Sequence, residues 1–210
     1  VHDHADEDVH DHADEDDHDG VDPHYWTHPE ALLEMIEVIA AHMITMKPDL
    51  ESAINARAQQ LTQAFEAEFK LLSDELALLN LDEAKMYVAG HNAVAYYAHY
   101  FDLHVESLFP DFVPDAELTS SQLETFINVI KQDQVSFFFI EPLFDTQPLA
   151  ANAIVNGLSS EGYTVEFEEL YQFHNIGQTQ FNDNATLLTL FAHNRTSILL
   201  SLEKNHAHSD

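Results

Sequence analysis

The chain has 210 residues, and its 7 Lys and Arg stand against 38 Asp and Glu, which gives a formal net charge of −31. Because so negative a chain repels phosphate backbones, we expect no nucleic-acid partner and favour metal cations or basic partners. Apolar residues make up 45% of the chain and cysteine is absent, so a folded core is expected while thiolate metal sites and cysteine nucleophiles are excluded.

Residues 1–20 form a segment of their own, in which the octapeptide VHDHADED occurs twice in tandem. The segment has ten acidic residues, no Lys or Arg, and five histidines, namely His2, His4, His10, His12 and His18. With almost nothing to bury, it is expected to be disordered without a ligand. It has two interpretations: a low-affinity collector of zinc, or a solvated, tag-like charge run. The exact repeat of histidines among acids favours the first.

Two helices are predicted next. Apolar residues recur at helical spacing from residue 31, Pro29 suits a first helical turn, and Pro48 ends the pattern. Asp49 is expected to cap a second helix. Residues 50–80 contain neither Gly nor Pro, which predicts one helix of about eight turns, long enough to connect two lobes.

The remainder of the chain reads as alternating strands and helices. Strands are predicted at residues 85–89, 103–108, 135–140 and 163–167, and helices at 92–101, 120–132, 148–161 and 182–203, with a loop at 109–118. This alternation predicts an α/β fold in which a long linker helix precedes a four-stranded parallel sheet flanked by helices.

Ligands of such sheets bind at the carboxyl ends of the strands, where metal-ligand residue types occur here. His91 follows the first predicted strand, Glu141 ends the apolar run VSFFFI, and Glu168 and Glu169 follow the fourth strand. A carboxylate next to four apolar residues is costly to bury unless it is paired or metal-bound, which favours a functional role for Glu141.

His24 precedes a predicted helix and the aromatic pair Tyr25 and Trp26. Taken singly, His24 also fits a capping or packing role, and His91 also fits a hydrogen-bonded structural role. Together the two imidazoles and one or two carboxylates suit Zn²⁺, or Mn²⁺ where oxygen ligands dominate.

Three motifs resemble those of one family. They are DPHYWTHP at residues 22–29, HNAVAYYA at residues 91–98 and IEPLF at residues 140–144, with the long Gly-free helix between the first two. In this order and spacing the chain resembles, over residues 20–203, the zinc-type (ZnuA-like) metal-binding solute-binding proteins of bacterial ABC importers. A histidine-rich loop before the first motif is also typical of the zinc members.

The resemblance implies that His24 and His91 are metal ligands, with zinc preferred to manganese because manganese members typically have Glu in place of His91. Family members have a further ligand Asp in an LDPL motif, where Glu168 stands here within FEEL. Glu168 is therefore a candidate third ligand, with water as the alternative. Glu141 is expected to orient a ligating imidazole, and Tyr25 and Trp26 to line the cleft beside it.

The resemblance also implies a division of the chain. It comprises a disordered loop at 1–20, a remnant of the N-terminal lobe at 21–48, the linker helix at 49–81, the C-terminal α/β lobe at 82–204 and a tail at 205–210. A further ligand histidine expected upstream of the loop has no counterpart, so most of the N-terminal lobe is taken to be missing. The helix at 29–47 is then expected to expose an apolar face.

The function implied is that of an extracytoplasmic receptor that captures Zn²⁺ and delivers it to the membrane permease of an ABC importer. We expect a monomer without enzymatic activity, located in the periplasm after removal of a signal peptide, and no apolar run approaches the ~20 residues that span a membrane. Two alternatives remain: a zinc-buffering or surface-interaction protein that binds mainly through residues 1–20, and a metallohydrolase with Glu141 as general base.

Overall fold

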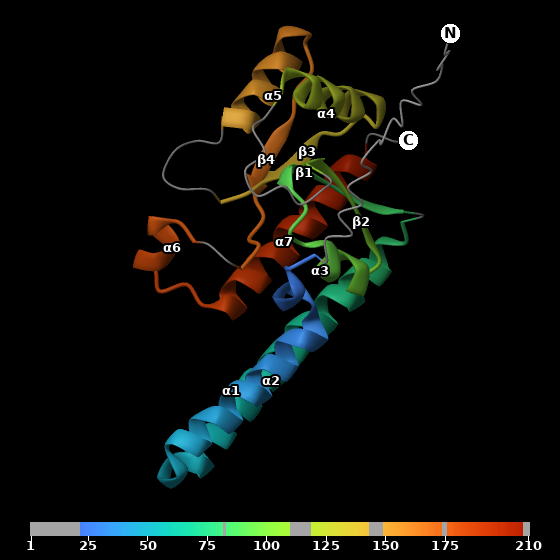
Figure 1. Cartoon of the computed structure of the whole chain (residues 1–210). Helices are drawn as coiled ribbons and strands as arrows, with labels where there is room; N and C mark the ends of the chain where they lie inside the picture. The colour runs from blue at the N-terminus through green and yellow to red at the C-terminus, as the bar shows by residue number, and fades with distance from the viewer. Residues whose placement is uncertain (1–21, 82, 110–118, 143–148, 174–175, 208–210) are drawn as a thin grey trace, which may run out of the picture.

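The computed structural model describes residues 22–81, 83–109, 119–142, 149–173 and 176–207. It consists of an α/β body from which a long hairpin of two helices projects (Figure 1). The predicted histidine-rich loop at 1–20 lies outside the described residues, as does the predicted loop at 109–118 apart from Phe109, which is the last residue of a strand.

The hairpin is formed by α1 (Pro29–Met46) and α2 (Glu51–Leu79). His28 caps α1, because its Nδ1 accepts the backbone N–H of Glu30 at 3.2 Å. The prediction that Asp49 caps the second helix is wrong. Asp49 lies within a 3₁₀ turn, η2 (Pro48–Leu50), which the fixed φ of Pro48 initiates, and α2 begins without a side-chain cap.

Part of α1 presents apolar side chains to solvent, as expected from its sequence. Val38, Ile39 and Met46 are exposed, and an open groove of about 370 Å³ runs between α1 and α2. None of the helices that the structure describes is both long and apolar enough to cross a membrane.

The body is built on a parallel sheet, which confirms the predicted fold class. Its strands are β1 (Ala84–His91), β2 (Leu103–Phe109), β3 (Phe137–Ile140) and β4 (Glu166–Glu169), in the order β2-β1-β3-β4. The helices of the body are α3 (Ala95–Tyr100), α4 (Ser120–Gln132), α5 (Leu149–Ser160), α6 (Gln178–Asn182) and α7 (Leu187–His206).

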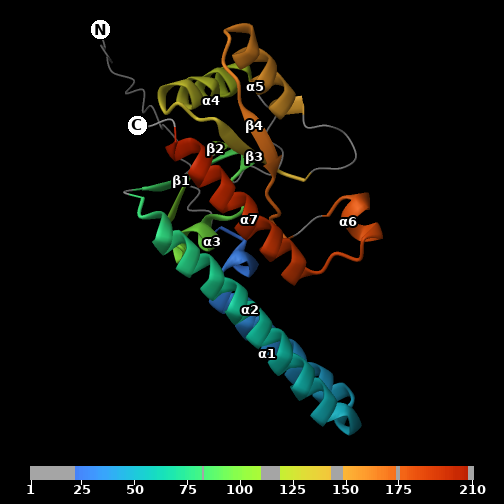
Figure 2. The ribbon, with the colours of Figure 1, turned by 180° about the vertical axis from the view of Figure 1, so that it is seen from behind.

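Both faces of the sheet are covered, which explains the unbroken apolar run of β3. Phe137 and Phe139 pack in one core with α2, α3 and α7, whereas Phe138 and Ile140 pack in a second core with α4 and α5. The view from behind shows α7 across one face, with α4 and α5 together on the other side of the sheet (Figure 2).

The fourth strand, β4, begins at Glu166 and ends at Glu169, whereas a strand at residues 163–167 was predicted. The chain at Tyr163 is still closing the end of α5, because its N–H donates to the carbonyl of Leu158 at 3.0 Å. Glu168 and Glu169 consequently lie inside β4, paired with β3, and not after the strand as predicted.

The C-terminal helical region is divided, whereas one helix was predicted at residues 182–203. A turn separates α6 from α7, and the Thr186 side chain caps α7 by accepting the N–H of Thr189 at 3.3 Å. The Thr cap stops α7 from extending further toward the N-terminus, because a cap residue adopts extended backbone geometry.

Candidate metal site

His24 lies in a tight turn just before α1 and is buried, with 4% of its surface exposed. The turn continues into η1 (Tyr25–Thr27), and the carbonyl of His24 accepts both the N–H and the hydroxyl of Thr27, at 3.0 and 2.9 Å. Asp22 Oδ1 accepts the backbone N–H of His24 at 2.9 Å and lies 2.6 Å from its ring Nδ1. The ring therefore has a fixed orientation.

His91 is the last residue of β1 and is oriented in a similar way. Glu141 follows β3 directly, and its Oε1 accepts the backbone N–H of His91 at 2.6 Å and lies 2.5 Å from the ring Nδ1. Because β1 and β3 are parallel neighbours, their carboxyl ends bring these two residues together, as the sequence predicts. Glu141 is buried, and these contacts offset the cost of burying its charge.

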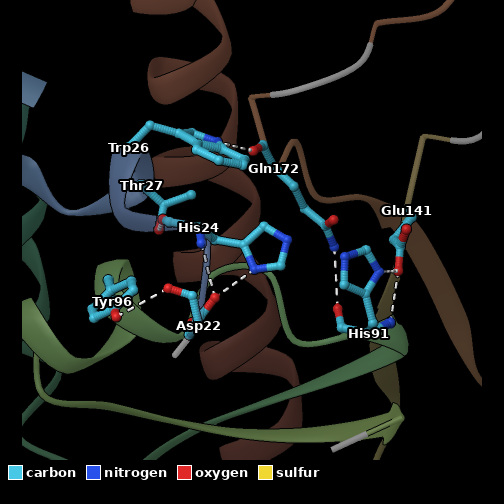
Figure 3. A network of polar contacts seen from close by, with 8 residues as sticks. All are labelled: Asp22, His24, Trp26, Thr27, His91, Tyr96, Glu141 and Gln172. Carbon is cyan, nitrogen blue, oxygen red and sulfur yellow. Dashed lines mark hydrogen bonds and ion pairs between the residues drawn. The ribbon is translucent and has the colours of Figure 1, made fainter. Parts of the chain in front are cut away.

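The two imidazoles face one another, each with its carboxylate on the far side (Figure 3). A carboxylate accepts hydrogen bonds, so these contacts favour the tautomer with the proton on Nδ1, in which Nε2 is the nitrogen that can bind a metal. The ring centroids of His24 and His91 lie 5.3 Å apart at an interplanar angle of 47°. Two imidazoles bound to one tetrahedral zinc at about 2.0–2.1 Å have centroids about 5 Å apart, so the pair fits a shared ion.

Gly90 makes the contact between Glu141 and His91 possible. A Cβ at residue 90 would lie 2.8 Å from Cγ of Glu141, closer than real side chains approach, and closer still to its carboxylate. Gly90 thus leaves room for the carboxylate over the backbone N–H of His91.

The aromatic residues after His24 differ in their placement. The Trp26 ring stands edge-on to that of His24, with centroids 5.3 Å apart, and its indole N–H donates to the carbonyl of Gln172 at 3.3 Å. Tyr25 is 56% exposed, and its ring lies nearly perpendicular to that of Trp26, with centroids 5.8 Å apart. Of the two predicted cleft residues, Trp26 is the one that connects His24 to the α/β body.

Glu168, the predicted third ligand, contacts α7. Its Oε2 accepts the hydroxyl of Ser197 at 2.6 Å. Within the described residues, no group of three or more His, Asp or Glu side chains is placed to hold a metal ion. The structure therefore brings together His24, His91 and Glu141, and leaves Glu168 apart from them.

Two residues of the site were not singled out from the sequence. Asp22 belongs to the DPH motif, but its role as partner of His24 was not predicted. Gln172 is fully buried in the segment after β4, and its side-chain amide donates to the carbonyl of His91 at 3.3 Å. Gln172 is uncharged and lies 81 positions from His91, so no local sequence pattern indicates that the two residues are in contact.

The parallel sheet, the long helix before it and the two histidines near its carboxyl edge are the features expected of the metal-binding solute-binding class of proteins. The sequence model of the ZnuA family, described as zinc-uptake complex component A, periplasmic, matches residues 1–199. The chain belongs to this family, and the resemblance predicted from the three motifs is confirmed.

Two relatives illustrate the similarity. The zinc-binding lipoprotein AdcA of Streptococcus pneumoniae is 25% identical over 160 residues, which cover 76% of this chain and 28% of AdcA. The solved Zn(II)-bound ZnuA-like domain of AdcA superposes with a TM-score of 0.66 at 18% identity, over 87% of this chain and 64% of that domain.

The periplasmic zinc-binding protein TroA from Treponema pallidum has a TM-score of 0.70 at 17% identity, over 86% of this chain and 64% of TroA. At these identities the solved structures establish the shared fold. This chain spans less than two thirds of the length of each solved relative and under a third of the curated AdcA sequence.

Proposed function

We propose that this protein is an extracytoplasmic receptor that captures Zn²⁺ and passes it to the membrane permease of an ABC importer. The family description names periplasmic zinc uptake, and the relatives AdcA and TroA are described as zinc-binding. Zinc is the cargo in this proposal, so the site must hold the ion and later release it. The receptor acts as a monomer.

The observation that carries the proposal is the geometry of His24 and His91. The two rings lie with centroids 5.3 Å apart, and Asp22 and Glu141 contact the Nδ1 side of each ring, so Nε2 is the nitrogen with which each histidine would bind zinc. Carboxylate partners of this kind fix the tautomer of a metal-bound imidazole and make it a better ligand. Imidazole nitrogen suits zinc better than manganese, which prefers oxygen ligands.

Two imidazoles fill half of a tetrahedral zinc site. We assign the other positions to water or to further protein donors. Glu168 is left out of the proposed set because no group of three or more His, Asp or Glu side chains in the described part of the chain is placed to hold a metal ion. In the same proposal residues 21–48 belong to an N-terminal lobe, 49–81 connect the lobes, and 82–204 form the C-terminal lobe. The zinc site then lies where the lobes meet.

The geometry favours a receptor over a metallohydrolase. A hydrolase needs a general base free to activate a metal-bound water. Glu141, the residue considered for that role, uses one carboxylate oxygen to hold both the backbone N–H and the ring of His91. It orients a ligand in our proposal and does not act on water.

A chelator-competition zinc titration of the whole chain tests the proposal. The unmodified chain should bind one tight equivalent, and His91→Ala should lose it. His42→Ala, which removes an exposed histidine of α1, is the control and should leave the tight equivalent intact.

A second variant tests the zinc-buffering alternative. Replacing His2, His4, His10, His12 and His18 with Gln should remove weak binding only. If this variant still binds one equivalent of zinc tightly, the receptor proposal is supported. If the tight binding is lost, residues 1–20 supply the main zinc ligands.

A further inference from the structure

His24 and its neighbours show what holds one imidazole in place. Asp22 Oδ1 contacts both the backbone N–H and the ring Nδ1 of His24, and a buried hydroxyl, that of Thr27, donates to its carbonyl. The residue is fixed at its amide, its ring and its carbonyl. A metal ligand fixed in this way needs no reorganisation when the ion arrives.

His91 is fixed at the same three points by different residues. Glu141 Oε1 contacts its backbone N–H and its ring Nδ1, and the side-chain amide of Gln172 donates to its carbonyl at 3.3 Å. That carbonyl also accepts the N–H of Ala93 at 3.1 Å, so both of its lone pairs are used. Gln172 and Thr27 thus have the same role, because each donates a side-chain hydrogen bond to the backbone carbonyl of one histidine.

Gln172 also reaches the segment that carries His24. Its carbonyl accepts the indole N–H of Trp26 at 3.3 Å, and the Trp26 ring packs edge-on against His24. Figure 3 shows Gln172 spanning from Trp26 to the backbone of His91. One residue therefore contacts both histidine-bearing segments, which are separated by more than sixty positions of chain.

The residues on both sides of Gln172 contact side chains of α7. Asn194, fully buried, donates to the carbonyl of Tyr171 at 2.8 Å and accepts its N–H at 2.9 Å. Phe173 has a φ of +63° and stacks on Phe191 with ring centroids 3.9 Å apart. Both neighbours of Gln172 are therefore anchored by contacts within the protein.

We propose that Gln172 is a positioning residue of the zinc site, which sets the separation of His24 and His91 by bridging their two segments. This inference rests on the proposed zinc-binding function. Outer partners of metal ligands typically change affinity 10–100-fold when removed, so we expect a loss of about tenfold or more.

The test compares two variants of the whole chain. Gln172→Met keeps the length and bulk of the side chain but removes the donor to His91, and Gln180→Met is the control. Gln180 is also a hydrogen-bonded glutamine near the end of β4, but it contacts Glu169 and Tyr171 and neither histidine. Zinc affinity is measured by chelator competition, and the thermal unfolding midpoint is measured without metal.

We expect Gln172→Met to weaken zinc binding at least tenfold and Gln180→Met to change it less than twofold, with both metal-free chains folded. The visible spectrum of bound Co²⁺, which reports ligand geometry, should change in Gln172→Met alone. If Gln172→Met does not fold, Gln172→Asn, which keeps the amide but is one methylene shorter, should show the same loss of zinc affinity.

Unchanged affinity and an unchanged Co²⁺ spectrum in Gln172→Met would overturn the positioning role, as would an equal loss in Gln180→Met. His91→Ala is measured alongside. If His91→Ala loses the tight zinc equivalent while Gln172→Met keeps it, only the positioning role fails. If His91→Ala also keeps it, the proposed function itself fails.

Discussion

Single residues determine whether the two histidines can serve as ligands. Each imidazole has its Nδ1 beside one carboxylate oxygen, and Nε2 is the atom that we propose binds the metal. On the His91 side this arrangement depends on a residue with no side chain, because Gly90 lies under the carboxylate of Glu141.

Gly90→Ala should therefore weaken zinc binding about 10–100-fold, because the added methyl displaces Glu141 from the ring and the backbone N–H of His91. Chelator competition measures the effect. Gly157→Ala in α5 is the matched control, since its Cβ would meet only the flexible end of Ile127 at 3.1 Å. Equal affinities for the two variants would contradict the role assigned to Glu141.

The sequence predicts only part of this site. His24, His91 and Glu141 could be singled out because strand ends and a local motif mark them. Gln172 could not, since its contact with His91 depends on the tertiary packing of the segment after β4. Glu168 was misplaced because the start of β4 is set by pairing with β3, which a local apolar pattern does not specify.

At the scale of elements, α7 is tied to the long helix α2 by one arginine. Arg195 donates from Nε to Glu68 at 2.6 Å and from a terminal nitrogen to Glu75 at 2.7 Å. The hydrogen bond to Glu68 raises the pKa of Arg195 and outweighs the opposing effect of burial, with Glu75 adding to it. The guanidinium is thus a permanent charge between two carboxylates.

Arg195→Met should lower the free energy of unfolding by about 1–3 kcal/mol, since it leaves two partly buried carboxylates without their cation. Urea unfolding followed by circular dichroism measures the loss. Arg57→Met, at an exposed position of α2, should stay within about 0.5 kcal/mol of the parent chain. A loss no larger than that of the control would show that the contacts to Arg195 are not needed to join α7 to α2.

A second polar cluster connects β1 to the end of α4. Asp133 Oδ2 accepts from Lys85 at 2.9 Å and from the Tyr87 hydroxyl at 2.8 Å. Burial alone would raise the pKa of Asp133, but the hydrogen bonds from Lys85 and Tyr87 outweigh it and the net pKa is lowered. The cluster therefore stabilises the fold only while Asp133 is ionised.

Because the folded pKa of Asp133 lies below its unfolded value of about 3.9, its contribution is complete above that pH and is lost as the pH falls through the folded pKa. The free energy of unfolding of the parent chain should fall as the pH is lowered from about 5 to about 2, and Asp133→Asn should show a smaller fall. Asp74→Asn, which removes one partner of an exposed ion pair with Lys70, should show the same fall as the parent chain. Urea titrations at several pH values distinguish the two, and identical slopes for parent and Asp133→Asn would rule out the linkage.

Elements were predictable where the sequence pattern is strong and local. The long run of α2 without Gly or Pro is typical of a helix, and the wholly apolar run of β3 is typical of a strand that is buried on both faces of a sheet. The break between α6 and α7 was not predicted, because a Thr cap inside a polar stretch competes weakly with helix continuation.

At the scale of the whole molecule, the proposed zinc site lies where the helical hairpin meets the α/β body. His24 precedes the hairpin, whereas His91 and Glu141 belong to the α/β body, and Gln172 joins the two parts. Since both imidazoles are oriented within this chain, its central property should be zinc binding between His24 and His91.

A crystal structure of the zinc-loaded chain, with anomalous scattering recorded at the zinc edge, tests this claim most directly. Our account predicts an anomalous peak about 2.0–2.1 Å from Nε2 of both His24 and His91, with Glu141 still bonded to His91. A zinc ion bound to only one of these histidines, or bound solely elsewhere on the chain, would contradict it.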